Sequence, residues 1–179
     1  DTRSGLNMSN GFSTSFWVNC RDVNTRQWLV TKGTAVNTYA SDKGFGTTIF
    51  TPSNPGEYPR IYATINTSAA KYQLNTTEAL VENDWLYVTV TYTPNTNNGF
   101  KLYINEDLIS SITPSGTVNE THDLIIGENY LKESGNVYPS VSIIDEVKWY
   151  NKSLSLSEIK KNYKATKSQH KNNRSSNWS

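Results

Sequence analysis

The sequence predicts an all-β domain: an antiparallel, two-sheet jelly-roll sandwich with one short C-terminal helix. Three observations support this prediction. Apolar and polar residues alternate with the two-residue period of strands along most of the chain. Gly, Pro and Asn separate these segments at short intervals, and a helical signal occurs only near the end. A length of 179 residues fits one domain with a single core.

The alternating segments define the expected strands. In the first of them, Phe12, Phe16 and Val18 fall on one face and Trp17 falls on the other. Such strands suit a thin core between two sheets, and abundant aromatic and β-branched residues favour them. The predicted strands are Phe12–Val18, Trp28–Lys32, Gly44–Thr51, Tyr58–Asn66, Trp85–Thr93, Phe100–Asn105, Leu108–Ile112, Asp123–Ile126 and Val141–Tyr150.

The clearest predicted strand pair is a hairpin. Trp85–Thr93 and Phe100–Asn105 each carry a regular apolar face. The connecting segment Pro94–Gly99 is rich in residues that form turns. We therefore expect these two strands to be antiparallel neighbours in one sheet.

One helix is expected, from about residue 156 to about residue 164. Ser155 and Glu158 have the spacing of a capping box, and Leu154 and Ile159 have that of a hydrophobic staple. After Glu158 the chain carries six basic and no acidic side chains. We interpret residues 1–165 as the domain and residues 166–179 as a basic polar tail or linker, with a nucleic-acid arm as the alternative.

The cellular compartment is predicted as extracellular or surface-displayed. Cys20 is the sole cysteine, so an intrachain disulfide is excluded. No segment has the ~20 apolar residues of a membrane span, and no signal peptide is visible, which fits a mature or excised domain. Glycosylation sequons are slightly more frequent than composition alone gives, and they begin at Asn7, Asn66, Asn75, Asn119, Asn151, Asn173 and Asn177.

Five segments in order resemble the laminin-G-like, or concanavalin A-like lectin/glucanase, superfamily. The last of them is a strand that leads into the capped helix. The segments are Phe12–Val18, Trp85–Tyr92, Lys101–Asn105, Leu124–Gly127 and Ile144–Ile159. Two features depart from the family pattern: Asn105-Glu106 replaces the usual Asn-Gly turn, and few residues precede Phe12. The resemblance implies a concanavalin A-like jelly roll, in a family of mostly binding modules with a minority of glycan hydrolases and lyases.

Catalytic residues are not identified. The glucanase branch carries a Glu-x-Asp-x-x-Glu strand motif, which this sequence lacks. Adjacent acids such as Asp145 and Glu146 point to opposite faces of a strand. His122 and His170 are isolated from Cys and His residues at metal-ligand spacing, so a zinc site is not expected.

The resemblance also implies a structural calcium ion at Asp145. Calcium prefers several oxygen ligands, and backbone carbonyls and Asn side chains of residues 1–10 are the expected partners. The alternative is that the Asp145 carboxylate forms hydrogen bonds with a neighbouring loop.

The function predicted is non-catalytic carbohydrate binding in a secreted or surface protein, with a carbohydrate or glycoprotein as partner and neither nucleic acid nor a membrane span expected. Aromatic rings stack on sugar C–H groups, and planar polar groups bind the hydroxyls. The candidate residues are Tyr39, Tyr58, Arg60, Tyr62, Asn129 and Tyr130. Two alternatives stay open: a protein-binding adhesion or structural domain of a larger assembly, and a divergent glycan hydrolase or lyase.

Overall fold

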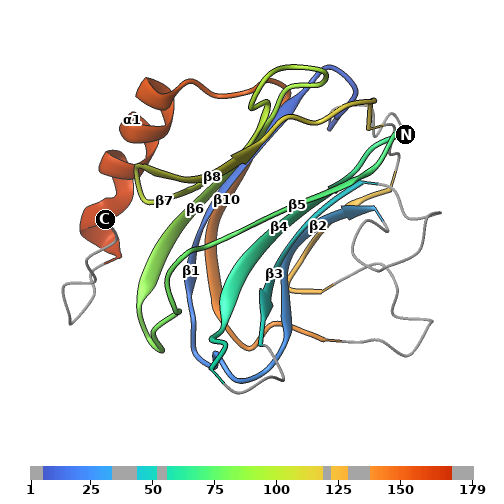
Figure 1. Cartoon of the computed structure of the whole chain (residues 1–179). Coiled ribbons are helices and arrows are strands. Elements are labelled where there is room, and N and C mark those ends of the chain that lie inside the picture. The colour runs from blue at the N-terminus through green and yellow to red at the C-terminus, as the bar shows by residue number, and fades with distance from the viewer. Residues whose placement is uncertain (1–5, 34–43, 52–55, 119–121, 129–137, 171–179) are drawn as a thin grey trace.

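The protein is a sandwich of two facing antiparallel sheets with one helix outside, as Figure 1 shows. The computed structural model describes residues 6–33, 44–51, 56–118, 122–128 and 138–170. The strands are β1 (Phe12–Asn19), β2 (Gln27–Gly33), β3 (Gly44–Phe50), β4 (Arg60–Asn66), β5 (Lys71–Asn75), β6 (Trp85–Tyr92), β7 (Phe100–Ile104), β8 (Asp107–Ile112), β9 (Leu124–Ile126) and β10 (Ile143–Tyr150).

Each sheet has five strands. Sheet A has the order β10-β1-β6-β7-β8, and sheet B has the order β5-β4-β3-β2-β9. The predicted hairpin is confirmed, because β6 and β7 pair antiparallel with Val88 opposite Ile104 and Tyr92 opposite Phe100. The predicted two-sheet sandwich with one short C-terminal helix is therefore confirmed.

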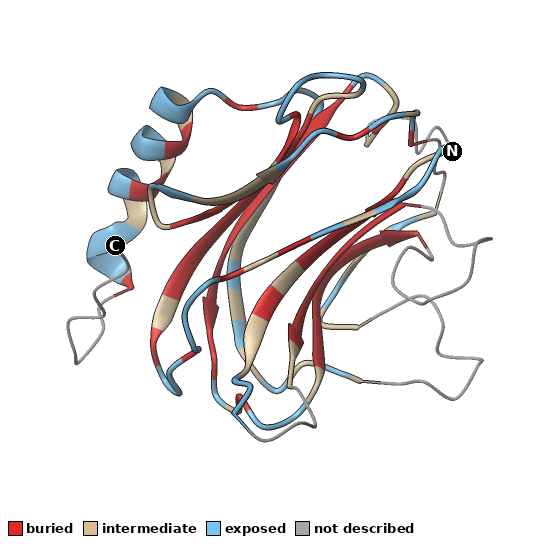
Figure 2. Cartoon of the chain, in the orientation of Figure 1, coloured by how far each residue is buried: buried red, intermediate tan, exposed pale blue. Residues whose placement is uncertain are grey.

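The core lies between the sheets and follows from the alternation along each strand. In β1, Phe12, Phe16 and Val18 point into the core, while Trp17 faces outward and belongs to a separate cluster. The Phe12 ring stacks on Trp149 of β10 with centroids 4.7 Å apart. Figure 2 shows that buried residues run along the facing strands of both sheets.

Two local features differ from the sequence expectation. β5 was not predicted, because the segment Lys71–Asn75 is short and mostly polar, as befits the edge of sheet B. In the turn between β7 and β8, Asn105 adopts φ 59°. Asn tolerates this left-handed conformation better than most residues, so the turn closes without the usual Asn-Gly pair.

The C-terminal helix α1 (Leu156–Thr166) begins at the predicted cap. Ser155 Oγ accepts a hydrogen bond from Glu158 N–H, and the Glu158 carboxylate accepts one from Ser155 N–H, as a capping box requires. The helix ends two residues later than expected. The 3-10 helix η3 (Lys167–Gln169) follows, and His170 is buried, so the described start of the expected tail packs against the sandwich. Neither helix is long and apolar enough to cross a membrane, which holds for the described residues.

Candidate functional site

The outer faces of the two sheets differ in what covers them. α1 lies against the outer face of sheet A, where Trp17 and Tyr87 pack with Tyr163 of the helix. Ile159 and Leu154 pack beside them on Tyr103. In the part of the chain that the structure describes, sheet B has no such helix on its outer face. Its outward side chains are therefore the ones to test as a binding surface.

A group of aromatic and arginine side chains gathers on the outer face of sheet B. We call it the aromatic–arginine face. β4 contributes two residues on the side opposite its buried Ile61 and Ala63, and the ends of neighbouring strands and loops contribute the rest. Its members are Arg26, Phe50, Tyr58, Arg60, Tyr62 and Tyr138, all partly or fully exposed.

The Arg26 guanidinium lies among three aromatic rings. Its central carbon is 5.1 Å from the Trp28 ring, 5.4 Å from Phe50 and 5.1 Å from Tyr138. Trp28 is fully buried beneath this group and packs on Tyr138. Burial lowers the pKa of Arg26 from its usual value, because desolvation disfavours the charged form. The guanidinium nevertheless remains cationic at neutral pH, because arginine is effectively always protonated.

β4 carries the other half of the face. The Arg60 guanidinium lies 4.5 Å from the centre of the Tyr58 ring, and the Tyr58 hydroxyl donates a hydrogen bond to Thr77 O at 3.0 Å. The Tyr62 ring meets Phe50 edge-on, with centroids 5.4 Å apart. Phe50 is directly opposite Arg60 in the β3–β4 ladder, so the two side chains emerge side by side.

Three predicted sugar-binding residues lie together on this face. Arg60 and Tyr62 lie on the outward side of β4, and Tyr58, two residues before the strand, lies against Arg60. The other three, Tyr39, Asn129 and Tyr130, lie outside the described residues.

Three members of the face were not predicted from the sequence: Arg26, Phe50 and Tyr138. Arg26 and Trp28 share one side of an alternating stretch, which was a usable signal. Tyr138 comes from a loop distant in sequence, and no local pattern points to it.

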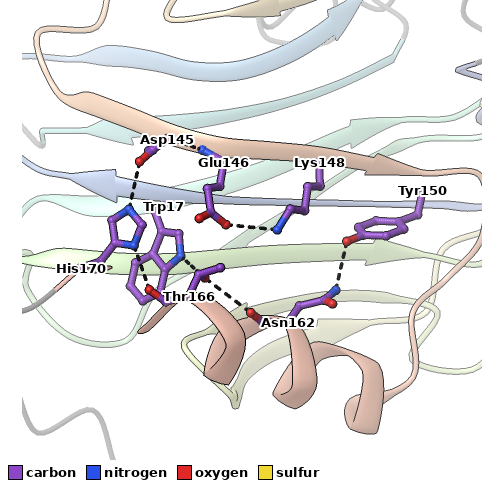
Figure 3. A network of polar contacts seen from close by, with 8 residues as sticks. All are labelled: Trp17, Asp145, Glu146, Lys148, Tyr150, Asn162, Thr166 and His170. Carbon is purple, nitrogen blue, oxygen red and sulfur yellow. Dashed lines mark hydrogen bonds and ion pairs between the residues drawn. The ribbon is translucent and has the colours of Figure 1, made fainter. Parts of the chain in front are cut away.

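Asp145 belongs to a polar network under α1 and η3, shown in Figure 3. His170 Nε2 lies 3.1 Å from Asp145 Oδ2, and its Nδ1 lies 3.2 Å from Thr166 O. Both oxygens are hydrogen-bond acceptors, so each is a suitable partner for a ring N–H of His170. Glu146 N–H donates to Asp145 Oδ1 at 2.7 Å, and these two bonds lower the pKa of Asp145, that from His170 most.

The described part of the N-terminal segment, residues 6–11, lies far from Asp145. Asp145 is opposite Trp17 in the β1–β10 ladder, about 17 Å along β1 from Phe12, where the N-terminal segment joins. That segment turns at the other end, with Gly11 beside Tyr92. Among the described residues no group of three or more His, Cys, Asp or Glu side chains is placed to hold a metal ion. Calcium binding therefore stays a prediction.

The network gives a pH-dependent prediction for Asp145→Asn. A carboxylate whose folded pKa is lowered stabilises the fold fully above its unfolded pKa, near 3.9, and this contribution is lost as pH falls through the folded pKa. The Asp145 side chain is 57% exposed, so we expect a loss below about 1 kcal/mol at pH 5 to 6. Urea unfolding of both proteins from pH 6 down to pH 2 should show the gap closing; a constant gap would contradict the assignment.

The acidic pairs and the thiol have structural partners. Asp145 pairs with His170, Glu106 lies 3.6 Å from Lys164 of α1, and Asp84 is buried. Burial, with a contribution from Asp84, raises the pKa of Cys20 to about 12, so its thiolate is not available as a nucleophile at neutral pH.

Solved structures with this fold include binding domains. A heptameric pentraxin from Limulus polyphemus has a TM-score of 0.63 at 10% identity, covering 87% of this chain and 70% of the pentraxin chain. The binding domain of botulinum neurotoxin serotype G has a TM-score of 0.64 at 16% identity, covering 93% and 39%. Botulinum neurotoxin type C, which requires two ganglioside molecules to enter cells, has a TM-score of 0.60 at 20% identity, covering 88% and 36%.

These likenesses concern the fold, and the chain spans less than two fifths of the neurotoxin chains. No curated protein sequence matches it. The family is nevertheless shown by sequence, because a model of the concanavalin A-like lectin/glucanases superfamily matches residues 1–160. Because this match covers most of the chain, and the two-sheet sandwich agrees with it, the chain belongs to the concanavalin A-like lectin/glucanase superfamily.

Proposed function

We propose that the chain is a non-catalytic carbohydrate-binding module of a secreted or surface-displayed protein, and that glycans bind on the aromatic–arginine face. The observation that carries this proposal is the placement of Arg60 and Tyr62 on the outward side of β4, beside Phe50, with the Tyr58 ring against Arg60. A calcium ion at Asp145 stays a prediction, and glycan binding on this face does not depend on it.

The chemistry of the face suits sugars. A sugar ring has an apolar C–H side that packs on aromatic rings, and hydroxyls that need donors and acceptors nearby. Tyr62 and Phe50 meet edge-on, so they form a corner of two ring faces. Arg60, fixed against the Tyr58 ring, supplies planar N–H donors next to that corner. The neurotoxin neighbour that interacts with gangliosides supports the same class of ligand on this fold.

The test is binding to an array of neutral and acidic glycans, followed by calorimetry with the best ligand. We expect Tyr62→Ala to raise the Kd about tenfold, because one stacking contact of about 1–1.5 kcal/mol is lost. Leu108→Ala is the matched control, since it removes an exposed side chain from β8 of sheet A. Binding should be unchanged in this control, and circular dichroism should show both variants folded.

Two results would overturn the proposal: no glycan of any class binds, or Tyr62→Ala binds like the unaltered protein. The first result would favour the second candidate, a protein-binding adhesion or structural domain. Three exposed apolar side chains support that candidate: Ile126 of β9, Ile143 of β10, and Val141 two residues before β10. β9 and β10 are edge strands of sheets B and A, at the side of the sandwich away from the other two edge strands, β5 and β8. Exposed apolar surface is typical of protein interfaces.

A further inference from the structure

We infer that the aromatic–arginine face selects acidic glycans, with Arg60 and Arg26 binding a carboxylate or sulfate group on the sugar. This inference rests on the proposed function and names the class of glycan. The observation behind it is that two guanidinium groups flank Phe50 without an acidic partner among the described residues.

Arg26 is the more constrained of the two cations. Three rings surround its guanidinium, and its Nε lies buried without a hydrogen-bond partner among the described residues. A partly buried guanidinium is stabilised by an anionic partner, because desolvating an uncompensated charge is costly. An anionic group on a bound ligand would provide the missing charge.

Arg60 presents the free donors. Its described contact is with the Tyr58 ring at 4.5 Å, and neither a hydrogen bond nor an ion pair engages its N–H groups within the described part of the chain. The cation–π contact with this ring restricts the positions open to the guanidinium. A held, planar fork of donors matches the two oxygens of a carboxylate or sulfate group better than a flexible lysine does.

The sheet sets the distance between the two cations. Arg26 leads into β2 and Arg60 begins β4, with β3 between them, so their backbones are about 10 Å apart, or two strand spacings. Phe50 lies between them and contacts the Arg26 guanidinium. A ligand whose sugar ring packs on Phe50 and Tyr62 therefore places a charged substituent within reach of either arginine.

The experiment compares three ligands that share one core: lactose, sialyllactose and sulfolactose. Sialyllactose carries a carboxylate and sulfolactose a sulfate ester, so the pair distinguishes the two sources of negative charge. We expect at least one acidic ligand to bind about tenfold more tightly than lactose at low salt. Arg60→Gln should remove this preference, measured as the ratio of the Kd for lactose to the Kd for the acidic ligand, because the charged contact is lost.

Lys101→Gln is the matched control for charge. It removes one positive charge from β7 of sheet A, on the other side of the sandwich. If net charge alone attracts the acidic ligands, both variants should bind them more weakly by the same factor. If Arg60 contacts the acidic group directly, only Arg60→Gln should bind them more weakly. Arg60→Lys is a second variant, and we expect it to retain part of the preference, since it keeps the charge without the planar fork.

The outcomes separate this inference from the proposed function. If lactose binds, Tyr62→Ala weakens it, and neither acidic ligand binds better, the carbohydrate-binding module stands and the selectivity is overturned. Equal losses in Arg60→Gln and Lys101→Gln also overturn it. If none of the three ligands binds and the wider array is negative as well, both proposals fail.

Discussion

Replacing Trp17 by alanine is expected to lower the free energy of unfolding by about 3–5 kcal/mol. Trp17 is fully buried on the outer side of β1, where it forms the contact between sheet A and the C-terminal segment. Its ring stacks on His170 at 4.4 Å and packs near Tyr87 and Tyr163. Its Nε1–H donates a hydrogen bond to Thr166 Oγ1 at 2.8 Å. The substitution therefore leaves a cavity and removes the main anchor of η3.

Urea unfolding followed by far-ultraviolet circular dichroism measures this loss. Leu156→Ala is the matched control, because Leu156 is a large apolar residue at the start of α1 but is 47% exposed. We expect the control to change stability by less than about 0.5 kcal/mol. Amide hydrogen exchange adds a local readout, and α1 should exchange faster than the strands in Trp17→Ala. A loss below about 1 kcal/mol would show that α1 is not docked on Trp17 in solution.

The sequence predicted most of the sandwich because its strands alternate strictly. Successive side chains of a strand point to opposite faces, so the two-residue period predicts that Phe12, Phe16 and Val18 share one face and that Trp17 lies on the other. β5 escaped prediction because an edge strand has one ladder and little buried surface, so Lys71–Asn75 lacks an apolar pattern. The helix start was predictable from its cap, whereas its end depends on tertiary contacts.

The candidate site was predictable only where it follows one strand. Arg60 and Tyr62 alternate with buried residues of β4, so one pattern placed both on the same face. The cluster around Arg26 joins β2, β3 and a loop more than a hundred residues away at Tyr138, and only the folded chain brings these together. The pairing of His170 with Asp145 was likewise not predictable from local sequence. The C-terminal stretch is polar and has no periodicity that indicates where it packs.

A close approach of two backbones makes Gly11 the second position with a large expected effect. Gly11 has φ +101°, a conformation that residues with a side chain rarely adopt, and an added Cβ would lie 2.7 Å from Tyr92 O. That oxygen belongs to β6, where Tyr92 pairs with Phe12, so it has little freedom to move. We expect Gly11→Ala to cost about 3 kcal/mol, from backbone strain of about 1–3 kcal/mol and the added contact.

Gly56→Ala is the matched control, because it separates the two causes. Gly56 also has a positive φ, +88°, but an added Cβ there meets no atom within 4 Å. The control therefore carries the conformational strain without the clash, and we expect it to cost about 1 kcal/mol. Chemical denaturation of both variants gives the difference, and equal losses would show that β1 can move away from Tyr92. A larger loss of stability in Gly11→Ala than in Gly56→Ala would show that the start of β1 depends on the close approach to Tyr92 that only glycine permits. The position of the Phe12 ring in the core depends on the same approach.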